Sequence, residues 1–424
     1  MGRWNLSHYA MRSCAALLAG CGGTQLPIGA SGANTAANEV AHRLPATSSY
    51  EVLHRFSLRG HAASSAPVGG LLNVNGTLYG TTSGKATGKH ECGTVFSLST
   101  AGAEKTLHRF QGPGDGCSPL DALVDLNGTL YGTTYTGGQY GYGVVFSITT
   151  SGAETVLYSF KGPPDGANPW GGLVAVNGTL FGTTARGGNV GGIHCPDTVG
   201  GYGCGTIYSI TTGGAESVLY AFKGEPDGYR PLAPLIAVKG RLYGTTTSGG
   251  LNSGTVFSVT TTGSEKVLYT FTGGTDGNYP FAPLLDVNGT LYGTTTSGGS
   301  SNNGNVFSVT PSGSENVLYS FAGGPDGQSP AAPLIDVNGT FYGTTNYGGG
   351  SGCNSGLANG CGTIYSLTPS GSEKVLNRFQ GGRDGALPQG ALVNLSGTLY
   401  GTTFAGGGKG CDGRGCGTAF AIRP

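Results

Sequence analysis

The residues that could do chemistry and recur most regularly are six aspartates, each followed by glycine. Each stands five residues after a phenylalanine and four before a proline: Asp115, Asp165, Asp227, Asp276, Asp326 and Asp384, with His61 at the equivalent place in the first segment. A ring of carboxylates would suit Ca²⁺, a cationic ligand or a polyhydroxyl ligand. The alternative is structural, because aspartate accepts backbone hydrogen bonds in turns whose following glycine takes a positive φ. Since one residue type recurs throughout, we favour the structural interpretation and predict no cofactor, with Ca²⁺ as the alternative.

Aromatic residues near these turns vary along the chain, which suits recognition better than a repeated residue does. Some follow the Asp-Gly pairs, namely Trp170, Tyr229, Tyr279 and Phe281, and others lie in glycine-rich segments, namely Tyr135, Tyr140, Tyr142, Tyr202, Tyr347 and Phe404. Flat rings among small polar residues can stack on sugar faces or anchor a protein partner. Core packing is the alternative for each of them. Trp170 is the strongest candidate, because the other tryptophan lies in the N-terminal leader.

Sequence motifs of established enzymes are absent. The chain has no G-x-S-x-G, no H-E-x-x-H and no complete phosphate-binding loop. The strand-like segments around His54 and His108 favour a packing role for these histidines, and His194 occurs beside a cysteine in a single loop. We therefore predict no catalytic residue and no metal site, although a site assembled from distant loops would escape this search.

Eight cysteines remain once Cys14 and Cys21 are assigned to the leader. Four of them occupy the same place in different copies of a repeat, and each has one further cysteine nearby. We predict the disulfides Cys92–Cys117, Cys195–Cys204, Cys353–Cys361 and Cys411–Cys416, each contributing about 2–4 kcal/mol in an oxidising compartment. Zinc binding is the weaker alternative, because the pairs fall in separate copies and lack C-x₂-C spacing.

Seven copies of one unit carry all these residues. The string Tyr-Gly-Thr-Thr, or Phe-Gly-Thr-Thr, begins at Tyr79, Tyr131, Phe181, Tyr243, Tyr292, Tyr342 and Tyr400. In the copy that follows Pro280, residues 284–287 form a predicted strand, Asn288-Gly289 is a two-residue hairpin signal, and 290–295 form the partner strand. Further strands are predicted at 306–309 and 316–321, which gives four antiparallel strands, A to D, per copy. Such strands are apolar on both faces and need neighbouring copies to cover them.

The two ends of the repeat region predict a closed ring. Residues 51–56 match a strand D that has no unit of its own, and residues 418–422 match a strand C that lacks a strand D. Pairing the two would leave no long sheet edge open. We therefore predict an all-β fold, a seven-bladed β-propeller of four-stranded antiparallel blades over residues 50–424, whose last blade is completed by the N-terminal strand. An open β-solenoid is the alternative. Variable D-to-A and B-to-C loops would share one face of the ring, where functional diversity is expected.

The repeat resembles a known family. The run L-x-x-V-N-G-T-L-Y-G-T-T, followed by G-T-V-F-S-V-T, G-S-E-x-V-L-Y-x-F and G-G-x-D-G-x-x-P, is similar to the GloVer repeat of the "choice-of-anchor tandem repeat" bacterial surface proteins and covers about residues 50–423. The resemblance implies export with a variable anchoring device and brings no established activity. A weaker similarity to kelch blades rests on the Gly-x-Leu-Tyr strand.

The N-terminus resembles a bacterial lipoprotein signal. Residues 1–20 form the predicted signal peptide, and Leu18-Ala19-Gly20-Cys21 matches the lipobox, with Cys21 as the lipidated residue. The alternative is a coincidental match in a leader rich in alanine and glycine. Residues 21–49 are rich in small and polar residues, which predicts a flexible tether. We expect an exported protein, either an envelope lipoprotein or an extracellular protein, that contacts the membrane only through the lipid.

Composition narrows the possible partners. The chain of 424 residues has 84 glycines, 10% charged residues and a formal net charge of zero, so it offers no basic surface for nucleic acid. We expect a monomeric binding or scaffold module for a glycan or protein partner on the variable-loop face. The alternatives are an extracellular hydrolase or lyase acting on polysaccharide, with aspartates and His194 or His61 at the mouth of the propeller channel, and a purely structural surface protein.

Overall fold

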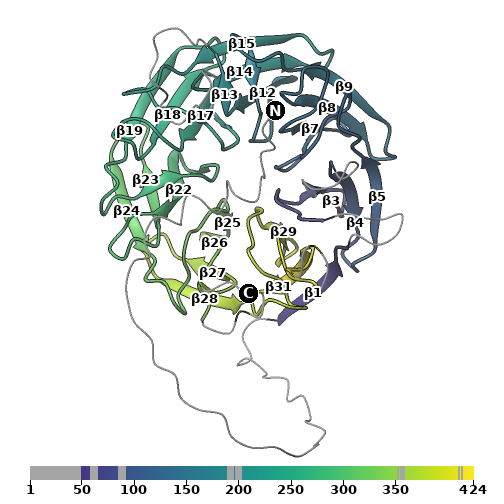
Figure 1. The fold of residues 1–424 in the computed structure, drawn as a ribbon. Helices are drawn as coiled ribbons and strands as arrows, with labels where there is room; N and C mark the ends of the chain where they lie inside the picture. Colours follow the sequence, from purple (N-terminus) through teal and green to yellow (C-terminus); the bar gives the residue numbers. More distant parts are fainter. Residues whose placement is uncertain are drawn as a thin grey trace, which may run out of the picture.

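The computed structural model describes residues 49–57, 65–84, 92–188, 195, 203–350, 353, 359–408, 411 and 414–424. These residues form seven antiparallel, four-stranded blades around a central axis, and the protein is a seven-bladed β-propeller (Figure 1). The predicted fold class is therefore confirmed. The described residues form no helix, so none of them provides a helical membrane span.

Each blade runs from an inner strand A to an outer strand D. The first three blades comprise β2 (Leu72–Val74), β3 (Thr77–Thr82), β4 (Thr94–Leu98) and β5 (Glu104–Arg109); β6 (Val124–Leu126), β7 (Thr129–Thr134), β8 (Val144–Thr149) and β9 (Glu154–Ser159); and β11 (Val174–Val176), β12 (Thr179–Thr184), β14 (Thr206–Thr211) and β15 (Glu216–Ala221). The next three comprise β16 (Ile236–Val238), β17 (Arg241–Thr246), β18 (Thr255–Thr260) and β19 (Glu265–Thr270); β21 (Leu285–Val287), β22 (Thr290–Ser297), β23 (Asn305–Val309) and β24 (Glu315–Ser320); and β25 (Ile335–Val337), β26 (Thr340–Thr345), β27 (Thr363–Leu367) and β28 (Glu373–Arg378). The seventh comprises β29 (Val393–Leu395), β30 (Thr398–Thr403), β31 (Thr418–Arg423) and β1 (Ser49–Arg55).

The Asn-Gly hairpins join strands A and B as predicted. Asn288 and Gly289 have φ values of 55° and 87°, the positive pair that a type I′ turn requires. Lysine and serine replace the asparagine in two blades, at Lys239 and Ser396, and they also adopt positive φ. These turns lie on the face of the ring that we call the hairpin face.

The hydrophobic core is divided among the seams, by which we mean the interfaces between neighbouring blades. At every seam, the phenylalanine that ends one blade packs edge to face against the strand C aromatic of the next, with ring centroids 5.0–5.4 Å apart. The seven pairs are Phe56–Phe96, Phe110–Phe146, Phe160–Tyr208, Phe222–Phe257, Phe271–Phe307, Phe321–Tyr365 and Phe379–Phe420. The series also spans the seam between the last blade and the first, so every seam of the closed ring has the same aromatic contact.

The two ends of the propeller meet in the seventh blade. Strand β1 pairs antiparallel with β31, with Ser49 opposite Arg423 and Arg55 opposite Thr418. In Figure 1 the purple β1 lies beside the yellow β31. The amide of Phe56 continues the ladder by donating to the carbonyl of Gly417 at 3.0 Å. This pairing closes the ring and excludes the open solenoid.

The D-to-A and B-to-C loops pair with each other on the opposite face, which we call the loop face. Short bridges join them in successive blades, for example between Cys117 and Thr136 and between Gln328 and Tyr347. In two blades the pairing is long enough to count as strands, with β10 (Gly166–Ala167) on β13 (Arg186–Gly187) and β20 (Asn278–Pro280) on β22. The loop face is therefore a hydrogen-bonded layer that presents fixed side chains.

Candidate ligand-binding site

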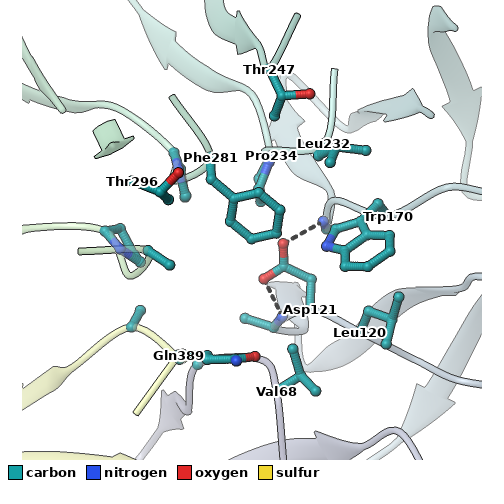
Figure 2. A pocket seen from close by; sticks show the side chains of 18 of the residues that line it. Val68, Leu120, Asp121, Trp170, Leu232, Pro234, Thr247, Phe281, Thr296 and Gln389 are labelled. Atoms are coloured by element: carbon teal, nitrogen blue, oxygen red, sulfur yellow. Dashed lines mark hydrogen bonds between the residues drawn. The ribbon is translucent and has the colours of Figure 1, made fainter. Parts of the chain in front are cut away.

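A cavity of about 280 Å³ opens at the centre of the loop face (Figure 2). The D-to-A loops of all seven blades line it, and residues at or after the end of strand B in three blades, such as Thr247, Thr296 and Tyr347, complete the lining. The residue after each repeated proline contributes to it: Val68, Leu120, Trp170, Leu232, Phe281, Ala331 and Gln389. This volume is just below the roughly 300–1,000 Å³ typical of ligand pockets, so it suits a small unit or the end of a chain.

Two repeated backbone features hold these loops in place. The residue before the proline adopts a positive φ of 54–60° in every blade, at Ala66, Ser118, Asn168, Arg230, Tyr279, Ser329 and Leu387. In five blades, the first threonine of the repeated Gly-Thr-Thr string then donates a hydrogen bond to a loop carbonyl of the next blade, whereas the buried hydroxyls of Thr245 and Thr294 have no partner among the described residues. Thr81 donates to Asp121 at 2.9 Å, Thr133 to Gly171 at 3.1 Å and Thr402 to Gly69 at 3.4 Å, the last across the closing seam. The mouth of the cavity is thus tied to the rigid strands.

Among the described residues that line the cavity, one has an acidic side chain, and it is Asp121. Its Oδ1 accepts a hydrogen bond from the amide of Ala122 at 2.6 Å. Its Oδ2 accepts one from the amide of Gly172, in the next blade, at 3.0 Å. Burial raises the pKa of Asp121 to about 6, although both amides act to lower it. The carboxylate is partly exposed into the cavity and largely removed from bulk water, so at neutral pH it is a charge in an apolar setting.

An aromatic wall stands beside this carboxylate. Trp170 is half-buried, and its ring packs edge to face against Tyr135 with centroids 5.2 Å apart and against Phe281 at 6.0 Å. Figure 2 shows Asp121 pointing into the space between Trp170 and Phe281. Tyr279 and Tyr347 also belong to the lining. Ring faces and an acceptor are therefore presented together.

The remaining aromatic candidates lie elsewhere. Tyr229 is only 2% exposed and belongs to the core between two blades, and Phe404 packs against the core between the sixth and seventh blades. Tyr140 is 46% exposed in the B-to-C loop of the second blade, and its neighbour Tyr142 packs against the core between the second and third blades. Tyr202 lies outside the described residues, as do His61, His90 and His194.

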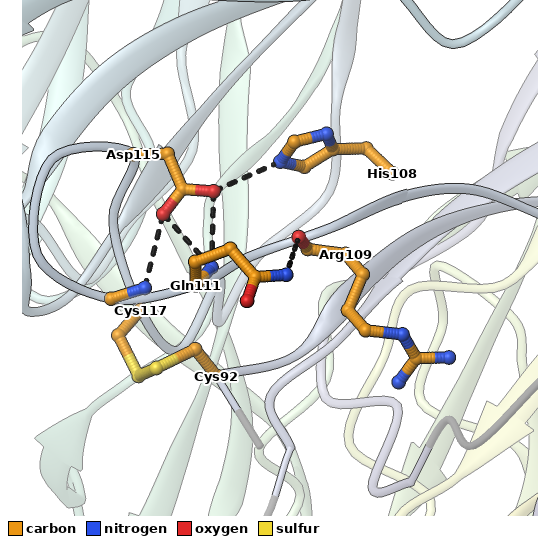
Figure 3. A network of polar contacts seen from close by, with 7 residues as sticks. Cys92, His108, Arg109, Gln111, Asp115 and Cys117 are labelled. Atoms are coloured by element: carbon orange, nitrogen blue, oxygen red, sulfur yellow. Dashed lines mark hydrogen bonds and ion pairs between the residues drawn. A yellow bond between two sulfur atoms is a disulfide. The ribbon is translucent and has the colours of Figure 1, made fainter. Parts of the chain in front are cut away.

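The six repeated aspartates serve their own turns. Each accepts a hydrogen bond from the amide four residues earlier, at 2.6–2.9 Å; the donors are Gln111, Lys161, Lys223, Thr272, Ala322 and Gln380. Tyrosine hydroxyls of strand D add a second bond in four blades, and in the first blade Nε2 of His108 lies 3.2 Å from Asp115 (Figure 3). The carboxylates are engaged locally instead of meeting in a ring. Within the described part of the chain, no three His, Cys, Asp or Glu side chains gather as metal ligands.

A glutamate of the following blade approaches each of five of these aspartates across a seam. Burial, followed by repulsion from the neighbouring aspartate, raises the pKa of Glu154, Glu216, Glu265, Glu315 and Glu373 to about 7. Their partners are Asp115, Asp165, Asp227, Asp276 and Asp326, in that order. Two ionised carboxylates at one seam repel each other, so the glutamate retains its proton to higher pH. These pairs make the charge at the seams depend on pH near neutrality.

The four expected disulfides are present in the structure. Cys92–Cys117, Cys195–Cys204, Cys353–Cys361 and Cys411–Cys416 have Cα–Cα separations of 4.3–5.6 Å. The first joins a B-to-C loop to the D-to-A loop beside it (Figure 3), and the other three close B-to-C loops. All four therefore reinforce the loop face that carries the cavity.

Sequence reasoning did not find Asp121, Gln389 or Asn346, which all line the cavity. Comparing the seven copies of the repeat would have singled out Asp121. Two residues after the repeated proline, the other six blades have Gly69, Gly171, Ala233, Ala282, Ala332 and Gly390. A carboxylate at a place otherwise reserved for glycine and alanine departs from the rule of the repeat. Asn346 is notable because its buried side-chain oxygen has no hydrogen-bond partner.

Several solved structures share a similar arrangement at low similarity. A PQQ-bound aldose sugar dehydrogenase from Streptomyces coelicolor has 15% identity and a TM-score of 0.47 over 89% of this chain and 99% of its own. A gluconolactonase from Xanthomonas campestris has 11% identity and a TM-score of 0.40 over 69% and 85%. A TM-score below 0.5 supports no inference about function.

Comparison of the sequence itself is more informative. No curated protein matches the chain. The model of the Gloeobacter/Verrucomicrobia repeat matches residues 16–193 and 197–355, which is well over half of the chain and includes the first five copies of the unit found above. This protein belongs to the family of the Gloeobacter/Verrucomicrobia repeat.

Proposed function

We propose that this protein is an exported, non-catalytic binding module that is anchored to the cell envelope through Cys21 and holds a glycan in the cavity of its loop face. The repeat family and the propeller fold fit a binding or scaffold role. The disulfides fit an oxidising compartment outside the cytoplasm. The lipobox at residues 18–21 supports the anchor.

The observation that carries the proposal is the position of Trp170 and Phe281 beside Asp121 in one cavity. A sugar ring has apolar C–H faces that stack on aromatic rings and hydroxyl groups that need acceptors at its edge. Asp121 and Gln389 both line the cavity (Figure 2) and supply such polar contacts. A small cavity of this chemistry favours the end of a glycan over a flat protein surface.

The same cavity argues against glycoside hydrolysis. Glycosidases use a pair of carboxyl groups about 5–9.5 Å apart, one as acid and the other as nucleophile or base. Among the described residues of the lining, Asp121 is the one carboxyl group, and two amides already bind it. Binding without turnover is therefore the function that this geometry supports best.

Thermal unfolding of the oxidised full chain against a panel of oligosaccharides tests the proposal. A ligand that binds only the folded state raises the unfolding midpoint by mass action. We expect one glycan class to raise the midpoint of the wild type but not of Trp170→Ala, which removes the stacking surface. Tyr140→Ala serves as a matched control on the same face, because Tyr140 is exposed outside the cavity.

Three outcomes would contradict the proposal. If no glycan raises the midpoint, a protein partner or a purely structural surface role replaces glycan binding. If Tyr140→Ala abolishes the shift and Trp170→Ala does not, the ligand binds the outer loops instead of the cavity. Release of reducing ends when the protein is incubated with a glycan would show turnover, and the protein would then be an extracellular hydrolase acting on polysaccharide.

A further inference from the structure

Asp121 is not needed to build the loop that carries it. The other six blades form the same loop, with the same positive φ before the proline, while having glycine or alanine at the equivalent place. Where a threonine hydroxyl fixes the loop at this position, it donates to the backbone carbonyl and not to the side chain. Thr81 donates to the carbonyl of Asp121 in this way, and Thr183 to that of Ala233. The carboxylate is thus an addition to the scaffold, placed where it reaches the cavity.

The surroundings of this carboxylate favour a positive partner. Leu120, Trp170, Leu232 and Phe281 form much of the wall near it in Figure 2, and burial raises its pKa against the effect of two amide donors. Arg230 also reaches the lining, but its guanidinium is not among the causes of that shift. An ionised carboxylate in an apolar wall gains more from a charged donor than from a hydroxyl.

Aromatic rings next to the carboxylate strengthen the same preference. The faces of tryptophan and phenylalanine rings attract cations through their quadrupole, and the attraction grows when water is excluded. Trp170 and Phe281 come from the third and fifth blades, and Asp121 enters from the second, so the three groups approach the cavity from different directions (Figure 2). Sugar hydroxyls alone would leave the negative charge without a counterpart.

We propose that the sugar unit entering this cavity carries a free amino group, whose ammonium binds Asp121 while its ring lies against Trp170 and Phe281. This inference rests on the proposed glycan binding and narrows it to amino sugars that are not acetylated. An N-acetyl group would place a neutral amide and a methyl group where the charge is needed.

Calorimetry on the oxidised full chain tests this with three oligosaccharides of equal length, made of glucosamine, N-acetylglucosamine or glucose. We expect the glucosamine form to bind about tenfold more tightly, or better, than the other two, as a charge-assisted hydrogen bond allows. Asp121→Asn, which keeps the shape and removes the charge, should abolish this preference. Asp121→Ala gives a second test, because alanine occupies this place in three blades and the loop forms there.

The matched control is Asp125→Asn on the hairpin face. Asp125 binds the amide of Gly128 in its turn, and Asn73 and Asn394 do the same in two other blades, so the fold accepts the change. This control should retain the preference for glucosamine, which distinguishes the cavity from general attraction of a cationic sugar. A preference that survives in both Asp121 variants would overturn the inference.

The remaining outcomes separate the two proposals. Equal binding of all three probes, or tighter binding of a neutral one, would overturn the amino-sugar inference and leave glycan binding intact. Failure of all three probes, together with every glycan of the thermal panel, would overturn both.

Discussion

Single residues in this propeller fall into those that the repeat requires and those that depart from it. Gly293 belongs to the first group, because a Cβ there would stand 2.5 Å from Cζ of Phe307, its cross-strand neighbour. The same glycine recurs beneath the strand C aromatic of every blade, for example Gly80 beneath Phe96. Asp121 belongs to the second group, because the other six blades have glycine or alanine at its place.

We expect Gly293→Ala to lower the free energy of unfolding by about 1–3 kcal/mol, the range for overpacking a well-filled site. Gly213→Ala is the control, since its nearest contact would be Oγ1 of Thr211 at 3.8 Å and its effect should stay within about 0.5 kcal/mol. Denaturant unfolding measures both. Equal stability of the two variants would show that the ring of Phe307 moves aside without cost.

At the scale of elements, the seams combine apolar packing with paired carboxyl groups. The five seam glutamates have pKa values of about 7 in the folded state, against an ordinary value of 4.5. The folded state therefore binds more protons than the unfolded state between these two pH values. By linkage, their contribution to stability is fully present below about pH 4.5 and is lost as the pH rises through about 7.

We expect the unfolding midpoint to be higher at pH 5 than at pH 8. The raised pKa of Asp121 acts in the same direction, whereas His54 opposes it because burial lowers the pKa of its imidazole. Replacing Glu315 by glutamine should flatten the dependence, and Lys266→Ala, a change at an exposed site, should not. A midpoint that rises from pH 5 to pH 8 in the wild type would contradict this account of the seams.

Strand order, hairpins and closure could be predicted because each depends on a short pattern that recurs. Asn288-Gly289 specifies a turn locally, and residues 51–56 and 418–422 identify each other as the missing parts of one blade. The cavity could not be predicted in the same way, since Asp121, Trp170 and Phe281 meet only after seven loops converge. Tyr229 and Tyr279 show how much one position matters, because Tyr229 directly follows its Asp-Gly pair and lies in the core, whereas Tyr279 stands one residue later and lines the cavity.

The whole molecule depends on the pairing of β1 with β31. Removing residues 1–57 leaves the seventh blade without its outer strand and exposes the edge of β31. We expect this truncation to unfold at a lower temperature and to aggregate. Removing residues 1–47, which spares β1, should leave the midpoint unchanged. Calorimetry with size-exclusion chromatography tests both, and equal behaviour of the two truncations would show that the ring closes without the latch.

Anchoring is tested in the producing cell. Cys21→Ser removes the proposed lipid attachment and leaves the propeller sequence intact, so the protein should move from the membrane fraction to the soluble or extracellular fraction. Cys14→Ser is the matched control within the leader and should remain with the membrane. An unchanged distribution of the Cys21 variant would contradict the lipoprotein proposal.

The direction of β1 determines at which face of the propeller an anchor would be attached. Ser49 lies opposite Arg423, at the hairpin-face end of the blade, and Arg55 lies opposite Thr418, at the loop-face end. The chain therefore enters the propeller on the side away from the cavity. A tether at residues 21–49 would therefore join the propeller at the hairpin face, and a lipid at Cys21 would leave the mouth of the cavity clear of the point of attachment.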